Sequence, residues 1–353
     1  MTGVPLADRP LADRLAQAIE QAGAISVAKY MAAANTHYYG SRDPLGVAGD
    51  FITAPEISQM FGELIGLWAA DLWLRAGKVK THWVELGPGR GTLTSDALRA
   101  MATGGFVPTV HLVETSVPLR VQQASRIPMA RWHDHVGTLP TDAPMIIIAN
   151  EFFDALPIQQ IMRTADGWRQ RRVAYEDGAF SFTNGPTVPL AIIPDTLKDA
   201  AEGSIIESCP DAVDVTRQLG QRLGEQGGAA LIIDYGYAGP AIGDTLQSVS
   251  NHAFADPLQD PGERDVTAHV DFTTLAAMGA LCGLAVQGAV DQGLWLSRLG
   301  LAERAAALAL AAPERSAETM AASRRLSSPE EMGRLFRVMS FSSGSWPLPA
   351  GFS

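Results

Sequence analysis

The feature that most constrains this 353-residue chain is a series of short apolar runs, separated by turns or by segments long enough for a helix. The first four runs are mostly apolar at every position, as strands covered by helices on both faces must be. Alternation of such strands with helices predicts a doubly wound, mostly parallel α/β sheet. The runs lie at residues 82–86, 110–114, 145–149, 229–234 and 284–291.

Apolar residues at helical spacing predict helices over residues 11–35, with a break at Gly23, and over residues 54–73. Between residues 154 and 228 the strand–helix order stops for about seventy residues, too many for a simple crossover. Asp-Gly pairs at 166–167 and 177–178 separate three short runs there and are typical of hairpin turns. We therefore predict a small antiparallel insertion at about residues 155–228, ending in a helix over about 210–225.

These patterns predict two parts of the chain. Residues 1–80 should form an N-terminal helical segment packed on the core, and residues 81–353 the main domain that carries the insertion. Hydrophobic residues make up 46% of the chain and charged residues 18%, which is typical of folded domains. The net charge of −11 argues against a nucleic-acid-binding surface, which needs basic residues facing the phosphates.

No apolar run approaches the roughly 18 residues needed to cross a bilayer, so we expect no membrane insertion. Cys209 and Cys282 lie far apart, which indicates a reducing compartment and argues against a disulfide framework or a cysteine-rich zinc site. Asp8, Asp13 and Glu20 interrupt the stretch where a signal peptide or presequence would be free of acids. We therefore expect a cytoplasmic location. The sequence leaves the oligomeric state open.

Residues 82–93 run from an apolar strand through Gly87, Gly89 and Gly91 into a helical pattern. Glycine permits a sharp turn and lets a ligand lie against the backbone, because no Cβ intervenes. The spacing differs from the G-x-G-x-x-G pattern that seats a pyrophosphate. Glu85 stands two places before the first glycine, where its charge would repel a phosphate and attract a sulfonium or an amine. We therefore expect Glu85 and the three glycines to bind S-adenosyl-L-methionine.

Two further acids follow neighbouring strands. Glu114 ends the next strand, 25 residues beyond the second glycine, where an acid in a doubly wound fold binds a ribose diol. Asp134 ends the third strand and would accept from the adenine amino group, with Trp132 or His133 stacking on the ring. An ordinary surface turn is the alternative there. His133 and His135 alternate along a strand and point to opposite faces, so we expect no metal site.

The third apolar run delivers Asn150, Glu151 and Asp154 at its carboxyl end. Ligands of open α/β sheets bind just beyond those ends. We therefore expect these side chains to face the transferable methyl group, with Asn150 on the cofactor side and Phe152 or Phe153 excluding water. The alternative is a polar helix cap followed by two core phenylalanines.

Five segments of the chain carry a more distinctive pattern, and the first reads Gly-Asp-Phe-Ile-Thr-Ala-Pro-Glu-Ile. They are residues 49–63, 85–92, 150–157, 234–237 and 261–272. Together they resemble the MidA-like methyltransferases, the family of the mitochondrial complex I assembly factor that methylates an arginine of a respiratory subunit. The resemblance covers most of residues 25–340.

The resemblance implies a class I, Rossmann-like methyltransferase fold with a seven-stranded sheet, S-adenosyl-L-methionine as cofactor, and a protein substrate. The implied acceptor is an arginine, for example in a respiratory NADH dehydrogenase subunit. Glu151 lies where arginine methyltransferases place a guanidinium-binding glutamate. Arginine arrives protonated because its pKa exceeds about 12, so two carboxylates would bind the guanidinium and take the released proton. We assign that role to Glu151 with Asp154 or Asp265. The next candidates, all in the distinctive segments, are Asp50, Glu56 and His269.

Residues 150–153 read Asn-Glu-Phe-Phe, whereas arginine methyltransferases carry Ser-Glu-x-Met-Gly-Tyr at this place. Because of this difference in the acceptor motif, three other functions stay open at this point. A methyltransferase for a small molecule would have an enclosed apolar pocket, whereas a protein arginine methyltransferase needs an acidic one. A non-catalytic S-adenosylmethionine-binding assembly factor would lack the geometry for transfer, in which the sulfur, the methyl carbon and the acceptor nitrogen lie in one line. A nicotinamide-dependent oxidoreductase is disfavoured by the glycine spacing.

Overall fold

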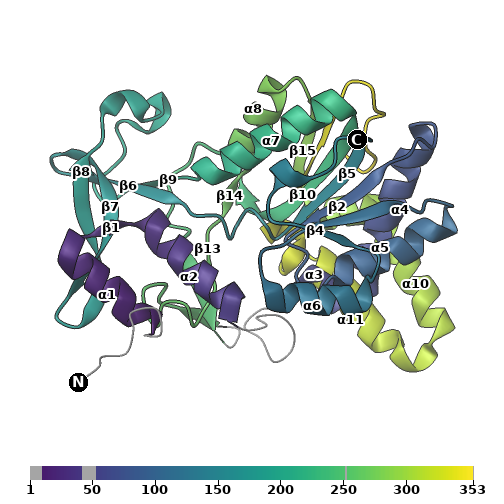
Figure 1. Ribbon diagram of the computed structural model, residues 1–353, viewed down its shortest axis with the longest axis horizontal. Helices are drawn as coiled ribbons and strands as arrows, with labels where there is room; N and C mark the ends of the chain where they lie inside the picture. The colour runs from purple at the N-terminus through teal and green to yellow at the C-terminus, as the bar shows by residue number, and fades with distance from the viewer. Residues whose placement is uncertain (1–9, 42–52, 251–252, 353) are drawn as a thin grey trace.

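The computed structural model describes residues 10–41, 53–250 and 253–352, and a mixed sheet forms the centre of its larger part (Figure 1). The strands, in order across the sheet, are β4 (Arg131–His133), β3 (Thr109–Val113), β2 (His82–Leu86), β5 (Met145–Asn150), β10 (Gly228–Tyr237), β16 (Phe336–Ser342) and β15 (Ala285–Asp291). The first five run parallel, and β16 is antiparallel to both of its neighbours. A two-residue strand, β14 (Val270–Asp271), pairs with the end of β10. The predicted doubly wound, mostly parallel sheet is confirmed.

Alternate residues of the central strands enter two different hydrophobic clusters, one on each face of the sheet. On β5, Ile146 and Ile148 pack in one cluster and Met145 and Ile147 in the other. A strand covered on both sides has no polar face, which explains its continuous apolar run. The first cluster includes side chains of α4 (Gln59–Arg75), α5 (Thr92–Thr103), α9 (Gln292–Arg298), α10 (Leu301–Ala311), α11 (Ser316–Ser327) and α12 (Met332–Leu335). The second includes those of α7 (Pro210–Gln226) and α8 (Phe272–Leu281).

The helix expected over residues 54–73 is two helices, α3 (Ala54–Ile57) and α4. Ser58 separates them with an extended backbone (φ −163°, ψ 139°), and its hydroxyl accepts a hydrogen bond from the Met60 amide at 3.2 Å. A serine that caps a new helix start in this way interrupts a pattern that looks continuous in the sequence. The break turns α3 toward the carboxyl ends of the central strands.

The predicted antiparallel insertion is confirmed as a second sheet, drawn at the opposite end of the molecule in Figure 1. Both Asp-Gly pairs lie at its hairpin turns, and Asp177 and Gly178 adopt φ values of 52° and 83°. Two successive positive φ angles match the twist of the flanking strands, which is why Asp-Gly is favoured there. The sheet consists of β1 (Ile25–Ser26), β6 (Gln159–Thr164), β7 (Gly167–Glu176), β8 (Ala179–Thr187) and β9 (Ile205–Ser208).

The first two helices, α1 (Leu11–Ala22) and α2 (Val27–Ser41), pack on this insertion sheet rather than on the main sheet (Figure 1). Leu15 of α1 belongs to the same cluster as Val173 of β7, and β1, between the helices, pairs with β7. Of the described residues before residue 80, α1 and α2 therefore pack on the insertion sheet, whereas α4 packs on the main sheet. We propose that α1, α2 and the insertion form one unit, while α3 and α4 belong to the main domain.

A third, small sheet contains β11 (Gln247–Ser250), β12 (Ala253–Ala255) and β13 (Val266–Thr267). The remaining helix, α6 (Val117–Arg126), follows β3. Across the described ranges, no helix combines the length and the apolar character that a bilayer crossing requires.

Candidate functional site

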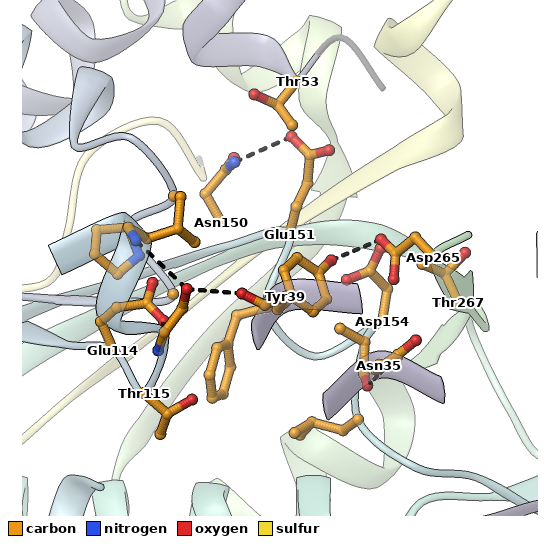
Figure 2. Close-up of a pocket in the computed structure, with 18 of the residues that line it drawn as sticks. Asn35, Tyr39, Thr53, Glu114, Thr115, Asn150, Glu151, Asp154, Asp265 and Thr267 are labelled. Carbon is orange, nitrogen blue, oxygen red and sulfur yellow. Dashed lines mark hydrogen bonds between the residues drawn. The ribbon is translucent and has the colours of Figure 1, made fainter. Parts of the chain in front are cut away.

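A cavity of about 540 Å³ lies at the carboxyl ends of β2, β3, β5 and β10 (Figure 2). This volume is within the usual range for small-molecule sites, and the position is the usual one in open α/β sheets. The lining residues come from both the cofactor side and the acceptor side expected from the sequence. Those predicted residues are Glu85, Gly87, Gly89, Glu114, Asn150, Glu151, Asp154 and Asp265.

The turn after β2 requires glycine at its first two predicted positions. Gly87 and Gly89 have φ angles of 59° and 52°, a conformation that side chains rarely adopt. A Cβ added to Gly87 would also lie 3.1 Å from Cδ2 of Phe152. The glycine turn is therefore packed directly against the loop that follows β5.

Glycine is required at the third position, Gly91, for a different reason. Gly91 precedes α5 in a left-handed conformation (φ 78°), and it does not line the cavity. A Cβ there would lie 3.1 Å from Cδ1 of Ile127 and 3.5 Å from Cγ of Gln123. Packing at the start of α5, rather than contact with a ligand, accounts for this glycine, so we no longer assign it to the cofactor.

Glu85 is buried at the end of β2 and accepts a hydrogen bond from the Thr94 hydroxyl. That hydroxyl in turn accepts one from the Trp83 indole nitrogen at 2.7 Å. Burial raises the pKa of Glu85 to about 7, against the lowering effect of the Thr94 hydrogen bonds. A cationic ligand in the cavity would therefore favour the ionised form of this carboxylate.

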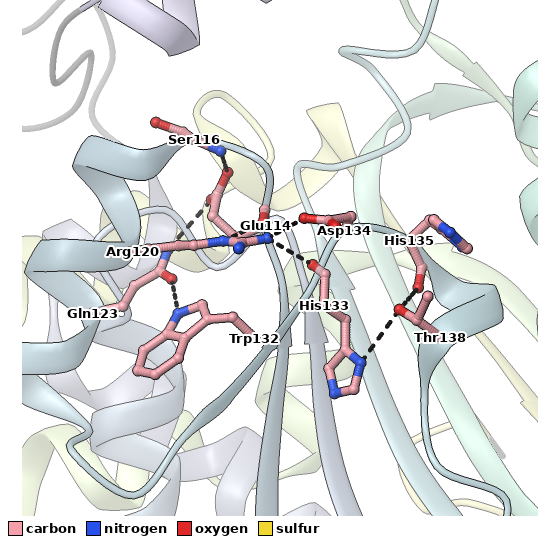
Figure 3. Close-up of polar contacts among 9 residues, drawn as sticks. All are labelled: Glu114, Ser116, Arg120, Gln123, Trp132, His133, Asp134, His135 and Thr138. Carbon is pink, nitrogen blue, oxygen red and sulfur yellow. Dashed lines mark hydrogen bonds and ion pairs between the residues drawn. The ribbon is translucent and has the colours of Figure 1, made fainter.

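Glu114, just after β3, is held by residues close to it in sequence (Figure 3). Its two carboxylate oxygens accept hydrogen bonds from the Ser116 amide at 2.8 Å and from the Gln123 side-chain amide at 3.3 Å. Burial raises its pKa, and it faces the cavity. A fixed carboxylate in this place can accept hydrogen bonds from a diol.

Asp134, the acid expected to bind the adenine, does not line the cavity. Its side chain is 74% exposed and forms an ion pair of 2.6 Å with Arg120 of α6. Trp132 also points elsewhere and donates a hydrogen bond of 2.8 Å to Gln123. Because α6 brings Arg120 to the end of β4, Asp134 pairs with this arginine instead of facing the cavity. Among the described residues, no three His, Cys, Asp or Glu side chains are grouped closely enough to hold a metal ion.

Glu151 is the first residue after β5 and has a left-handed backbone (φ 50°). Its Oε1 accepts a hydrogen bond from the Ala54 amide at 3.3 Å. It accepts a second from the Asn150 side-chain amide at 3.1 Å (Figure 2). Burial raises the pKa of Glu151 to about 7; these two hydrogen bonds lower it, and the charge of Asp265 raises it. The start of α3 thus fixes the orientation of this carboxylate.

Two more carboxylates lie beyond Glu151 (Figure 2). Asp265 accepts a hydrogen bond of 2.6 Å from the Tyr39 hydroxyl. Asp154 is buried, and its pKa lies well above the ordinary value because of burial and then of the charges of Asp234, Asp265 and Glu151. The structure thus brings together the three acids assigned to the acceptor, Glu151, Asp154 and Asp265. Asp50, one of the next candidates, lies outside the described residues.

Several lining residues were not found from the sequence. Asn35 and Tyr39 come from α2, where a polar and aromatic stretch follows an apolar one; this was the available signal. The Asn35 side chain donates to the carbonyls of Ala155 and Val266 at 3.0 and 2.8 Å, and accepts from the Val266 amide at 3.0 Å. It therefore ties α2 to the acceptor side. The other lining residues missed include Thr53, Pro55, Thr115, Ser116, Leu119, Tyr235 and Thr267.

The two remaining candidates are placed differently. Glu56 lines the cavity and accepts a hydrogen bond of 2.5 Å from the Thr92 hydroxyl. His269 does not line it; its ring stacks on Tyr235 with 6.1 Å between the ring centroids. Glu56 therefore contributes to the wall beside the glycine turn, whereas His269 supports a lining residue from behind.

The residues present fit a nucleoside-containing cation such as S-adenosyl-L-methionine. Oδ1 of Asn150 is buried beside the glycine turn and has no hydrogen-bond partner among the described residues. Buried polar atoms are normally bonded, so a donor group of a ligand would satisfy it. The open glycine backbone leaves room for that ligand, and Glu85 supplies a negative charge.

A glycine turn after one strand, an acid after the next, and a cavity at the ends of a sheet of this strand order define a class I methyltransferase. A family model for S-adenosyl-L-methionine-dependent methyltransferases matches residues 64–290. The mitochondrial protein arginine methyltransferase NDUFAF7 of Danio rerio is 36% identical over 94% of this chain and 87% of its own length. For the Homo sapiens protein of the same name the identity is 36%, over 83% and 74%. The chain belongs to this family and is an S-adenosyl-L-methionine-dependent methyltransferase.

A solved structure agrees with this assignment. A methyl transferase superfamily member from Burkholderia thailandensis, bound to S-adenosyl-homocysteine, superposes with a TM-score of 0.84 at 27% identity. The superposition covers 97% of this chain and 94% of that one. The cofactor predicted from the glycine turn and its acids is thereby confirmed at the level of the family.

The location expected from the sequence is corrected by the same relatives. They are named as mitochondrial proteins, which contradicts a cytoplasmic location. The two isolated cysteines that suggested the cytoplasm indicate only a reducing environment and do not distinguish one such compartment from another.

Proposed function

We propose that this enzyme transfers a methyl group from S-adenosyl-L-methionine to a terminal nitrogen of an arginine in a protein. We further propose that the protein is a subunit of the respiratory NADH dehydrogenase. The relatives named as protein arginine methyltransferases support the acceptor class. The finer assignment to a respiratory subunit follows the sequence resemblance described above.

The observation that carries the proposal is the acidity of the acceptor end of the cavity. Glu151, Asp154 and Asp265 line it together, and Arg90, beside the glycine turn, is the one Lys or Arg among the described lining residues. Buried carboxylates that raise one another's pKa favour a cationic partner. A guanidinium stays protonated in proteins and offers several donors in one plane, so it suits such a pocket better than a neutral acceptor.

The three acids of the acceptor side have different roles in the proposed transfer. Glu151 has one oxygen tied to Ala54 and Asn150, which leaves the other, Oε2, to orient a guanidinium nitrogen. Asp154 and Asp265 bind the remaining donors, and a carboxylate of raised pKa takes the proton that the nitrogen releases. The cofactor supplies an activated methyl group on a sulfonium. Alignment of acceptor and donor is the main contribution of the chain.

The alternative of a small-molecule acceptor requires an enclosed apolar pocket, and the acidic lining speaks against it. The alternative of a non-catalytic assembly factor is an outcome of the decisive experiment. That experiment compares Glu151→Gln with wild type, because glutamine keeps the shape and one acceptor oxygen but removes the charge. Glu207→Gln is the matched control, since Glu207 is also a hydrogen-bonded carboxylate of raised pKa but lies in the insertion sheet away from the cavity.

We expect label transfer from radioactive cofactor to a lysate of a deletion strain to fall by about 10² or more in Glu151→Gln. Cofactor affinity, measured by calorimetry, should stay within about threefold, and Glu207→Gln should match wild type in both assays. Labelled arginine in the target band supports the proposal. Full transfer by Glu151→Gln contradicts the assigned acceptor site. Rescue of respiratory assembly by a wild type that labels nothing would establish the scaffold function instead.

A further inference from the structure

Asp234, near the carboxyl end of β10, is fully buried directly behind the turn formed by residues 151–154. The sequence resemblance included this residue, but the mechanism above leaves it without a function. We propose that Asp234 is a positioning residue for methyl transfer, whose carboxylate holds the turn that carries Glu151 and Phe152 in register with the glycine turn. The inference rests on the proposed function for its activity readout only.

The contacts of Asp234 are concentrated on one turn. Its Oδ2 accepts hydrogen bonds from the backbone amides of Phe152, Phe153 and Asp154 at 3.2, 2.9 and 3.3 Å. Its Oδ1 accepts one from the Tyr235 amide at 2.9 Å. Both oxygens therefore face donors. An asparagine in this place would turn its NH₂ group toward one set of these N–H groups, and its neutral oxygen would accept hydrogen bonds from the others less strongly than a carboxylate does.

The backbone of the turn is shaped for an anion. The Glu151 amide donates to the carbonyl of Ile233 at 2.9 Å, so four successive amides point toward two adjacent residues of β10. Glu151 has a positive φ of 50°, and successive N–H groups in such a conformation form a concave anion-binding nest. The anion here is a side chain of the neighbouring strand, which makes the shape of the turn depend on Asp234.

Two side chains of this turn, those of Glu151 and Phe152, determine how the acceptor is aligned with the cofactor. Glu151 leaves it toward Ala54 and Asn150 on the acceptor side. Phe152 leaves it toward the glycine turn, where its ring would lie 3.1 Å from a Cβ on Gly87. A shift of the turn would therefore move the acceptor carboxylate relative to the cofactor loop. A displacement of about 1 Å can cost on the order of a hundredfold in rate.

Asp271 offers a matched control for a purely structural effect. Its Oδ1 also accepts from backbone amides, those of Gly239, Thr273 and Thr274 at 3.2, 2.9 and 3.3 Å. It caps α8 and neither lines the cavity nor contacts the turn at residues 151–154. Asp271→Asn removes a comparable carboxylate without affecting the acceptor side, so it should lower stability only.

The test compares Asp234→Asn, Asp271→Asn and wild type in three assays. Hydrogen exchange reads the amides of residues 152–154 directly, calorimetry gives the cofactor affinity, and a synthetic glycine–arginine–glycine-rich peptide is the probe acceptor. In Asp234→Asn we expect hydrogen exchange at the amides of residues 152–154 to accelerate by about tenfold or more. A tenfold acceleration corresponds to a loss of about 1.4 kcal/mol in the free energy of local opening. Cofactor affinity should stay within about threefold, and kcat should fall by about 10² with a smaller change in KM. Asp271→Asn should change none of these.

Unchanged exchange at residues 152–154, or full kcat in Asp234→Asn, would overturn the inference. If Asp234→Asn does not fold, Asp234→Glu decides, because it keeps the charge and displaces the oxygens by one methylene. Loss of kcat with intact cofactor binding in that variant supports a positioning role, and full kcat overturns it. Absence of transfer by wild type to the arginine peptide would count against the proposed function. The exchange comparison would still decide whether Asp234 holds the turn.

Discussion

The two halves of the cavity are held in place by contacts of very different range. On the cofactor half, Glu114 is fixed by Ser116, two residues away, and Glu85 by Thr94, nine residues away. On the acceptor half, Glu151 is fixed by an amide 97 residues away. Asp265 is bonded to a hydroxyl 226 residues away. The carboxylates of the cofactor half are thus held by residues close to them in sequence, whereas those of the acceptor half depend on segments far apart in the chain.

This difference predicts that substitutions on the cofactor half act on cofactor affinity directly. Substitutions on the acceptor half should act on transfer and should depend on the relative placement of α2, α3 and β10. Three experiments test the comparison.

The largest effect is expected at the glycine turn. Gly89→Val places a branched side chain at a φ of 52° on the cavity wall, so cofactor affinity should fall by about 100-fold or more. Gly105→Val is the control, because Gly105 has a φ of 77° but open space around its Cβ position, in the turn after α5. Calorimetry should show normal affinity in the control and a similar loss of thermal stability in both variants. Equal affinity in the two variants would mean that backbone strain, not the cofactor, requires the glycine.

An intermediate effect separates the acids at two adjacent strand ends. Glu114→Ala should lose about 1.5–3 kcal/mol of cofactor binding, or about ten- to hundredfold in affinity, because it removes hydrogen bonds to a charged group. Asp134→Ala should change the affinity by less than about twofold, since it removes only an exposed ion pair with Arg120. Titration of both variants with S-adenosyl-homocysteine tests this. A large loss of affinity in Asp134→Ala would show that Asp134 contributes to cofactor binding.

The smallest effect is an opposite pH dependence of two ionisable groups, Glu151 of the acceptor half and His111 of β3, which does not line the cavity. Burial raises the pKa of Glu151 to about 7, so its folded form binds a proton that the unfolded form has released, and stability falls as pH rises toward 7. Burial, and then the charges of His82 and His133, lower the pKa of His111 in β3 to about 4. The unfolded histidine therefore binds a proton first, and stability falls as pH drops from about 6.5 to 4.

Thermal unfolding without cofactor should show both signs. Glu151→Gln should melt about 2 °C or more above wild type at pH 8 and close to it at pH 4.5. Between pH 7 and pH 4.5, the melting temperature of His111→Gln should fall by less than that of wild type. A Glu151→Gln variant that is less stable than wild type at pH 8 would contradict the burial of an ionisable acid at that position.

The sequence was sufficient where the determining contacts are local. The buried strands, the Asp-Gly hairpins and the glycine turn all follow from backbone preferences and apolar runs. The ion pair of Asp134 could not be predicted, because its partner Arg120 comes from a helix whose position the sequence does not give. The strand β16 was not located, because its residues 336–342 follow a helical region and mix apolar with polar side chains. Tyr39 and Asn35 could not be assigned, because their partners lie more than 100 residues away.

Asn35 has one further consequence. Its three hydrogen bonds join α2 to the segment after the 151–154 turn and to β13, while α2 itself rests on the insertion sheet. Substitutions on the insertion sheet can therefore shift α2, and with it the acceptor wall. The Ser116 hydroxyl donates to the Tyr39 carbonyl at 2.7 Å, so α2 also contacts the residue that holds Glu114, whereas the Thr94 contact of Glu85 is independent of α2. Changes to the acceptor wall can thus originate in a sheet that does not itself line the cavity.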